Sequence, residues 1–355
     1  MPQFQNFTSE DKIVETQKVT KGFFTGDVGT ATAFITASLS ASQKEYYLNM
    51  LQSGGTADEF SVSYGHYHGS SSTDTPVGQT EAVYWSMANL LLFPSELETQ
   101  GFTFSSSAGT AVTENDVYFI TAERARMKDR INRKNWSLTL SGSTSAAGGT
   151  TGTHIVLTDD SDNVTATPTP VGPRYNVVSG SNGTVVSASS AKCYGHFYPN
   201  LGIIALSGKQ LSASIPGANA TSGASATPAA DGTGVIGNGF GGLGAGVNNQ
   251  NHYRLATSII KGKSFTLRNE EDKLSTQYFV RAKAAHWNFS VNPTFSSGSE
   301  DATFRIDEMV GNPKTLITTI GLYDGGNNLV AAGKLSGAKV KSFVDEMMAK
   351  VIIDH

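Results

Sequence analysis

The stretch Leu316-Ile-Thr-Thr-Ile-Gly-Leu-Tyr323, Asp324-Gly325-Gly326, Asn328-Leu-Val-Ala-Ala332 decides the fold class of this chain. Two runs of apolar and β-branched residues flank a short Asp-Gly-Gly turn. Glycine in such a turn supplies the positive φ that tight hairpins require. The stretch therefore predicts an antiparallel hairpin over residues 315–335.

Further strands are predicted on the N-terminal side of this hairpin. Phe60, Val62 and Tyr64 alternate with small or polar residues, which is the period of two of a half-buried strand. Other strand-like runs are 116–121, 196–206 with a turn at Pro199-Asn200, and 277–281.

Two helices are predicted. The first covers residues 80–93, with Thr80 as N-cap and Pro94 after its end; its apolar face would be Val83, Met87, Leu90 and Leu91. The second runs from Lys339 to Lys350 and passes into a last strand, 351–353. Strands do not alternate with helices as in a parallel α/β sheet. We predict an α+β fold, predominantly antiparallel β, with sandwich-like domains, about two helices and long loops rich in Gly, Ser and Ala.

The distribution of charge suggests three segments. Between Lys209 and Arg254 the only charged residue is Asp231. A segment so poor in large apolar and charged side chains does not offset the cost of ordering its own backbone. We predict an N-terminal β-rich domain over 1–206, a low-complexity arm or loop over 207–252, which we expect neighbouring chains to order, and a C-terminal β-rich domain over 253–355.

Composition excludes several classes of protein. The 355 residues carry a net charge of −4, and 16% of them are charged, against about 25% in an average protein. This argues against a protein that coats nucleic acid, which needs a basic face. Residues 1–10 resemble no secretory signal, and no apolar run is long enough to span a bilayer. We expect neither membrane nor nucleic acid as a partner, and assembly in the cytoplasm.

Two glycine motifs resemble phosphate-binding loops. Gly237, Gly239 and Gly242 fit G-x-G-x-x-G, but no strand precedes them and no helical sequence follows. Gly262-Lys-Ser264 resembles the end of a P-loop, but the required first glycine would fall at Thr257. We interpret the first as part of a loop or arm and the second as a turn between strands.

Two sets of side chains invite a chemical interpretation. His66 and His68 would project from one side of a strand and share a metal ion, although a polar strand end or loop is the simpler interpretation. Cys193 precedes His196 by three residues, so on a strand the two would face opposite sides. A buried thiol is the simpler interpretation of Cys193 than a nucleophile.

A basic cluster is followed much later by an acidic stretch. The basic residues are Arg124, Arg126, Lys128, Arg130, Arg133 and Lys134; the acidic ones are Glu300, Asp301, Asp307 and Glu308. No aromatic residues interleave with the basic ones to stack bases. We interpret the cluster as a charged interface or a solvated face, with the acidic stretch as a hypothetical partner within or between subunits.

No nucleophile elbow, zinc-binding H-E-x-x-H helix or paired-carboxylate motif occurs. We predict that the protein is not an enzyme and has no catalytic residues, no cofactor and no metal beyond the His66 and His68 pair considered above.

Several blocks, in order, resemble virion structural proteins of large contractile-tailed bacteriophages, especially those of marine cyanobacteria. The blocks are Ser63-Tyr-Gly-His-Tyr-His-Gly-Ser70, Ala82-Val-Tyr84 through Asn89-Leu-Leu-Leu92, Arg124-Ala-Arg-Met-Lys128 leading to Asn135-Trp-Ser-Leu138, Tyr175-Asn-Val-Val-Ser-Gly-Ser181, Tyr198-Pro-Asn-Leu-Gly-Ile-Ile204, Asn288-Phe-Ser-Val-Asn-Pro-Thr-Phe295, Asn312-Pro-Lys-Thr-Leu-Ile-Thr-Thr-Ile-Gly-Leu-Tyr323, Val330-Ala-Ala-Gly-Lys-Leu-Ser336 and Lys341-Ser-Phe343. The resemblance weakens at the N-terminus and over 208–251.

The resemblance implies a structural subunit of a tailed-phage virion, in the tail or baseplate, where a looser similarity to the baseplate wedge subunit is found. Its partners would be other virion proteins and copies of itself. A head, neck or decoration protein is the nearest variant. Receptor or carbohydrate binding is an alternative, with Tyr67, Trp85 or Trp287 as stacking platforms, although Trp85 fits a helix core better. An envelope hydrolase would need a carboxylate pair in a cleft, which the sequence does not show.

Overall fold

The computed structural model describes residues 4–38, 46–67, 80–99, 101–106, 109–142, 154–186, 192–211, 213–215, 252–290, 292–297 and 303–354. Antiparallel strands dominate, and four α-helices lie among the described residues. The predicted class, α+β with mostly antiparallel sheet, is confirmed.

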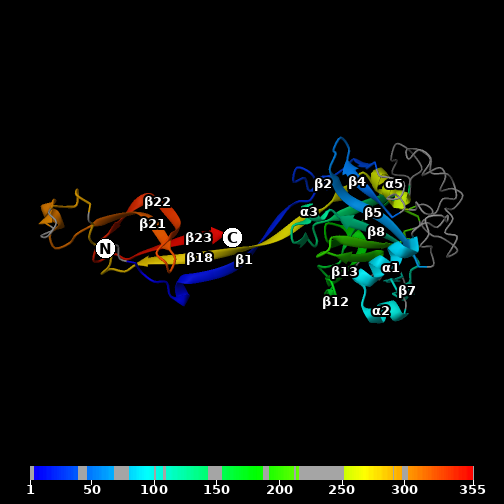
Figure 1. Cartoon of the computed structure of the whole chain (residues 1–355), viewed down its shortest axis with the longest axis horizontal. Helices are drawn as coiled ribbons and strands as arrows, with labels where there is room; N and C mark the ends of the chain where they lie inside the picture. The colour runs from blue at the N-terminus through cyan, green and yellow to red at the C-terminus, as the bar shows by residue number, and fades with distance from the viewer. Residues whose placement is uncertain are drawn as a thin grey trace. The chain divides into compact units, whose positions relative to one another are not determined.

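The chain divides into two compact units (Figure 1). Unit 1 combines residues 1–18 with 272–355, and unit 2 comprises 19–271. The predicted boundaries differ, because 1–18 joins the C-terminal unit and 253–271 packs in the core of unit 2. Strands β1 (Lys12–Gly22) and β18 (Arg268–Ala282) each begin in one unit and end in the other.

Unit 2 is built on a long antiparallel sheet. Its strand order is β2 (Thr30–Ala31), β17 (Phe265–Thr266), β10 (Ser137–Ser141), β11 (His154–Asp159), β13 (Gly172–Ser181), β15 (Gly195–Tyr198), β16 (Ile203–Ser207), β8 (Asp116–Ala122), β5 (Asp58–His66), β4 (Tyr47–Gln52) and β3 (Phe34–Thr36). Two short strands, β12 (Thr167–Thr169) and β14 (Thr184–Val185), also pair with β13.

The two ends of this sheet are tied together by the chain. β2 stands at one end of the strand order and β3 at the other, yet only residues 32 and 33 separate them in sequence. A flat sheet of this many strands would hold its outer strands far further apart, since neighbouring strands are about 4.8 Å apart. The sheet therefore curls back toward itself, as in a barrel.

Helix α5 (His252–Gly262) fills the space that the curled sheet leaves. It packs against β3, β4, β5 and β10, which come from opposite ends of the sheet. Tyr253, Leu255 and Ile259 join the main core, which includes Trp136 and Phe265. Its polar side, with Arg254, Thr257 and Ser258, is buried as well as its apolar side, whereas a surface helix turns its polar face to solvent.

A second core lies on the other face of the sheet. Helix α1 (Thr80–Leu91) packs against β5 there (Figure 1). Alternate residues of β8 serve both cores, with Phe119 in the second and Tyr118 in the first. Gly65 lets the helix approach: a Cβ there would lie 2.7 Å from the Cα of Tyr84. The predicted first helix is confirmed over Thr80–Leu91, but Thr80 is its first residue and not its N-cap.

Short elements complete unit 2. They are α2 (Pro94–Thr99), β6 (Thr103–Ser105), β7 (Ala111–Thr113), α3 (Arg124–Met127) and β9 (Arg130–Ile131), which pairs with β18.

Unit 1 contains a sheet and a separate hairpin. The sheet has the order β1, β18, β23 (Met347–Asp354). The predicted hairpin is confirmed, with β21 (Thr315–Tyr323) paired to β22 (Leu329–Lys341). In its turn, Asp324 accepts hydrogen bonds from the side chain and backbone of Asn328 and from the Gly326 backbone, and these bonds lower the pKa of Asp324. Smaller elements are η1 (Ser9–Asp11), β19 (Ser296–Ser297), β20 (Thr303–Phe304) and η4 (Asp307–Met309).

The predicted helix over 339–350 is wrong. β22 continues to Lys341, a turn follows, and β23 begins at Met347. In the turn Ser342 donates to the Asp345 carboxylate at 2.6 Å and accepts from the Val344 backbone, and such local bonds compete with helical ones. Eight residue pairs between β23 and β18 then fix the strand. The predicted last strand, 351–353, lies inside β23.

Candidate functional site

Unit 1 exposes large apolar side chains along most of its strands. The exposed large apolar residues of unit 1 are Phe4, Phe7, Ile13, Val14, Leu274, Trp287, Phe289, Ile306, Val310, Leu316, Tyr323, Leu329, Val330, Val340, Phe343, Val344, Met348 and Ile352. We call this set the apolar surface. Large contiguous apolar patches on folded proteins are typical of interaction sites, so we take this set as the candidate functional surface.

The same unit has almost no core of its own. Among its described residues, Leu322 is the only apolar residue whose side chain is buried. Ordering each backbone residue costs about 1–2 kcal/mol, and a fully buried Val or Leu side chain returns about 1.5–3 kcal/mol. Unit 1 alone therefore lacks the burial that would stabilise its strands.

The hairpin exposes both of its faces. Leu329 and Val330 are neighbours in β22 and so project to opposite sides, yet they are 56% and 63% exposed. Leu316 of β21 is 65% exposed. A sheet that covers a core has one buried face and one polar face, and this hairpin has neither.

A groove of about 850 Å³ runs through unit 1. Residues 315–325 of the hairpin, 279–282 of β18 and the N-terminal residues 4–7 line it. Two ring contacts hold the N-terminal segment: Phe4 lies 5.0 Å from Tyr323, and Phe7 lies 5.3 Å from Tyr278, measured between ring centroids. Trp287 and Phe289 also line the groove.

Polar contacts fix the chain path in unit 1. Arg281 of β18 lies 2.9 Å from a carboxylate oxygen of Asp11, and Gln277 donates to Glu15 at 2.8 Å. These contacts join the N-terminal segment to β18. Many residues of the apolar surface lie on other strands, namely β21, β22 and β23.

Lys341 closes the base of the hairpin from inside. Its buried ammonium donates to the carbonyls of Ala284 and Ser342, at 2.9 and 2.7 Å, and to Oδ1 of Asn288 at 3.0 Å. Asn288 in turn donates to the Ala284 carbonyl at 2.6 Å. Three uncharged oxygens thus accept hydrogen bonds from the ammonium. Lys341 is a structural tie in the sense that it joins the segments that carry these oxygens.

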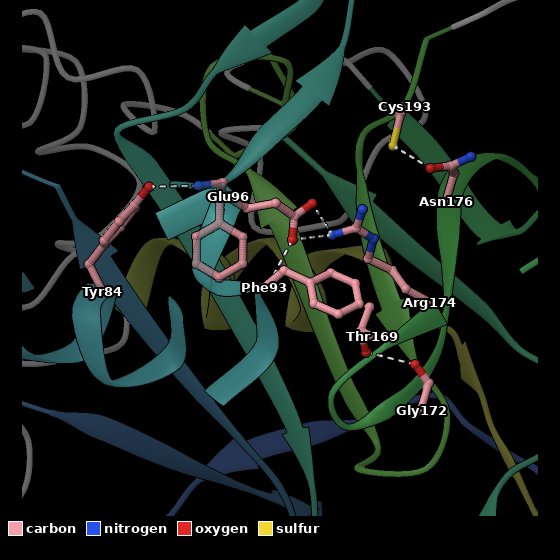
Figure 2. Close-up of polar contacts among 9 residues, drawn as sticks. Tyr84, Phe93, Glu96, Thr169, Gly172, Arg174, Asn176 and Cys193 are labelled. Atoms are coloured by element: carbon pink, nitrogen blue, oxygen red, sulfur yellow. Dashed lines mark hydrogen bonds and ion pairs between the residues drawn. The ribbon is translucent and has the colours of Figure 1, made fainter. Parts of the chain in front are cut away.

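In unit 2, several polar side chains form hydrogen bonds and ion pairs between elements. Figure 2 shows Glu96 of α2 reaching Arg174 of β13, with a shortest N–O distance of 3.0 Å. The hydroxyl of Tyr84 accepts from the Phe102 backbone at 3.0 Å and donates to the Glu114 carbonyl at 3.1 Å. These bonds join loops and helices to the sheet.

Cys193 and His196 do not form a catalytic pair. Cys193 is buried and donates to the Gly195 carbonyl at 2.8 Å, and its sulfur lies 3.6 Å from Oδ1 of Asn176 (Figure 2). Burial raises the pKa of Cys193 to about 11, so the thiol stays protonated at neutral pH. His196 is buried against Phe104, and burial together with Arg174 lowers its pKa.

The structure describes only His66 of the histidine pair, so a metal ion shared with His68 stays a prediction. His66 is buried at the end of β5, with Nε2 3.8 Å from the Asp116 carboxylate. That carboxylate also accepts a 2.5 Å hydrogen bond from Tyr64. His68 lies outside the described residues. Within the described part of the chain, no group of three or more His, Cys, Asp and Glu side chains is arranged to hold a metal ion.

Four members of the basic cluster have partners within unit 2. Arg130 lies 2.7 Å from Glu270, Lys134 lies 2.5 Å from Asp162, and Arg126 lies 3.4 Å from Glu59. Arg133 donates to the Tyr175 hydroxyl and stacks on that ring. These four residues thus join separate segments of unit 2 to one another. Glu300 and Asp301 lie outside the described residues, and the hypothetical pairing with the acidic stretch stays a prediction.

The glycine motifs have different positions. Gly237, Gly239 and Gly242 lie outside the described residues, as does most of the predicted 207–252 segment. Gly262 ends helix α5, and Lys263 has a φ of 54°. A P-loop needs its helix after the motif, whereas here the helix comes before it. The predicted turn is present, but it joins a helix to strand β17.

The proposed aromatic platforms separate into two kinds. Tyr67 and Trp85 pack on each other, with ring centroids 5.0 Å apart, and both pack on the second core. Trp287 is 41% exposed at the groove of unit 1.

The sequence reasoning missed the apolar surface. A signal for it exists in residues 347–353, where apolar side chains occupy both alternate sets of positions: Met347, Met348, Ala349, Val351, Ile352 and Ile353. Apolar residues on both sides of a strand are typical of a strand that other elements cover on both faces. A unit of this size does not have enough elements to cover both faces.

Comparison of the chain with protein-family models, curated proteins and solved structures found no match. None of the helices in the described part of the chain combines the length and the apolar character that crossing a membrane requires.

Proposed function

We propose that this protein is a structural assembly subunit, in which unit 2 is the self-sufficient body and unit 1 supplies the interface. The observation that carries the proposal is the apolar surface on a unit that has one buried apolar side chain among its described residues. Partner chains would provide the burial that unit 1 lacks.

The magnitude of the missing burial supports this division of roles. Each Leu or Val that passes from exposed to buried contributes about 1.5–3 kcal/mol. Covering only Leu316, Leu329 and Val330 would contribute several kcal/mol, which is comparable to the whole stability of an ordinary domain, about 5–15 kcal/mol. Obligate interfaces have this character, since they resemble a core cut in half.

We further propose that the assembly is the virion of a tailed bacteriophage, in its tail or baseplate. The support is the ordered set of sequence blocks that resemble contractile-tail virion proteins, several of which fall on unit 1. On this proposal the partners are other virion proteins and copies of this chain.

A paired substitution tests the assembly proposal. Leu329→Ser with Val330→Ser removes apolar area from both faces of β22. We expect the wild-type chain to self-associate or bind partner virion proteins in analytical ultracentrifugation, and the variant to associate at least about a hundredfold more weakly. Val186→Ser is the matched control, because Val186 is 78% exposed on unit 2. Equal loss in the control, or a wild-type chain that binds nothing, would contradict the proposal.

Mass spectrometry of purified particles tests the virion assignment. Six or twelve copies per particle would support the tail or baseplate, hundreds would indicate the head, and absence would reject the assignment.

Receptor or carbohydrate binding is a second candidate, favoured by exposed Trp287 and Phe289 beside the groove. The free protein would then block phage adsorption, and Trp287→Ala would abolish the block.

A further inference from the structure

Strand β23 forms the outer edge of the sheet in unit 1. It pairs on one side with β18, from Met347 opposite Ala282 to Asp354 opposite Ser275. Among the described strands, none pairs with its other side. An open edge presents a row of backbone donors and acceptors that a further strand can use.

The side chains of β23 alternate in exposure. Met347, Ala349, Val351 and Ile353 are half-buried, whereas Met348, Lys350, Ile352 and Asp354 are exposed. Met348 and Ile352 are 64% and 52% exposed. The exposed set therefore carries one positive charge, one negative charge and two apolar groups on a single face.

This exposed set is complementary to itself. In an antiparallel pair of identical strands centred on Ile352, Ile352 faces its own copy, and Lys350 of each chain faces Asp354 of the other. Directly opposite residues on one face are close enough to interact, and opposite charges there are favourable. The pairing is isologous and closes at two chains.

Other registers lack this complementarity. Centring the pair on Val351 sets Lys350 against Ile352, and centring it on Lys350 sets the two lysines against each other. A shift by one residue would place exposed side chains opposite half-buried ones, because alternate residues face opposite sides.

We propose that a second copy of this chain pairs antiparallel with β23, centred on Ile352, and extends the β1–β18–β23 sheet across a two-fold axis. The inference rests on the proposed role in assembly and names one of its contacts. Neither charge has an in-chain ion pair among the described residues: Lys350 lies opposite Phe279 and Asp354 opposite Ser275.

Charge exchange in the full-length chain tests the pairing. Lys350→Asp and Asp354→Lys each place two like-charged pairs in the interface, so each variant should dimerise about tenfold more weakly in sedimentation at low salt. The double variant restores both pairs, and it should dimerise as the wild type does.

Mixing the two single variants provides the sharper test. A Lys350→Asp chain and an Asp354→Lys chain together form only opposite-charge pairs, so the mixture should give heterodimers of wild-type strength. Lys334→Asp is the control, since Lys334 is an exposed lysine on β22, and it should leave dimerisation unchanged.

The failures of the two proposals are distinguishable. If the wild type associates but neither the double variant nor the mixture rescues the single variants, the β23 pairing is overturned while the assembly role stands. If the wild type is monomeric at every concentration and is absent from particles, both are overturned.

Discussion

At the scale of single residues, Lys341 is the clearest determinant of stability in unit 1. Its ammonium holds three oxygen atoms from the segments that meet at the base of the hairpin. Those oxygens would stay buried without a donor if the cation were removed, and a buried unsatisfied acceptor costs about 1–3 kcal/mol.

We therefore expect Lys341→Met to lower the free energy of unfolding of unit 1, measured at concentrations where the chain assembles, by about 2 kcal/mol. Lys339→Met, on the same strand at an exposed position, should change it by less than about 0.5 kcal/mol. Chemical denaturation followed by the fluorescence of Trp287 measures both. Equal effects of the two substitutions would show that Lys341 is not a structural tie.

At the scale of elements, the contact between α1 and β5 depends on one missing side chain. A Cβ at Gly65 would lie 2.7 Å and 2.8 Å from the Cα and N atoms of Tyr84. The end of a flexible side chain can move away from an added Cβ, whereas the backbone atoms of a packed helix cannot do so without a shift of the helix.

Gly65→Ala should therefore destabilise unit 2 by about 1–3 kcal/mol through overpacking. Gly333→Ala on β22 meets no atom within 4 Å and should be close to neutral. Thermal unfolding followed by circular dichroism separates the two. An unchanged midpoint for Gly65→Ala would mean that α1 lies further from β5.

Prediction from sequence succeeded where an element carries its own local signal. The 315–335 hairpin was found from its Asp-Gly-Gly turn, although the positive φ of the turn falls on Asn327, at 62°, and on neither Gly325 nor Gly326. Helix α1 has its apolar spacing and a proline after its end. The apolar face of α1 was shifted, however: Leu90 is 44% exposed, whereas Tyr84 and Ala88 are buried. The spacing of apolar residues predicts that a helix forms more reliably than it predicts which face of that helix is buried.

Prediction failed where distant partners decide. Residues 339–350 have apolar residues at helical spacing, but pairing with β18 sixty or more residues away makes the latter part a strand. Helix α5 was missed because it follows a low-complexity stretch, although Leu255 and Ile259 at i and i+4, with Gly262 at the end, are a helix signal. The apolar surface was missed because local sequence does not distinguish an apolar side chain that stays exposed from one that is buried in the core of its own chain.

At the scale of the whole molecule, the two units should differ in local stability. Unit 2 has two cores around its sheet, whereas unit 1 has one buried apolar side chain among its described residues. Segments with few buried apolar contacts open more often, and their amide hydrogens exchange faster.

We expect hydrogen exchange of the dilute chain to be fast in β21, β22 and β23 and slow in β8 and β16. At concentrations where the chain assembles, β23 should become protected while β8 and β16 change little. Protection of β23 that is independent of concentration would show that unit 1 is stable without partners.

The two crossings between the units have a mechanical consequence. β1 and β18 pass from one unit to the other as continuous strands, and a strand at about 3.3 Å per residue is already close to the full extension of a polypeptide. An extended strand can therefore lengthen only a little further when it is pulled. A force that a neighbouring subunit applies to unit 1 would therefore be transmitted along β1 and β18 to the hydrogen-bonded strands of unit 2.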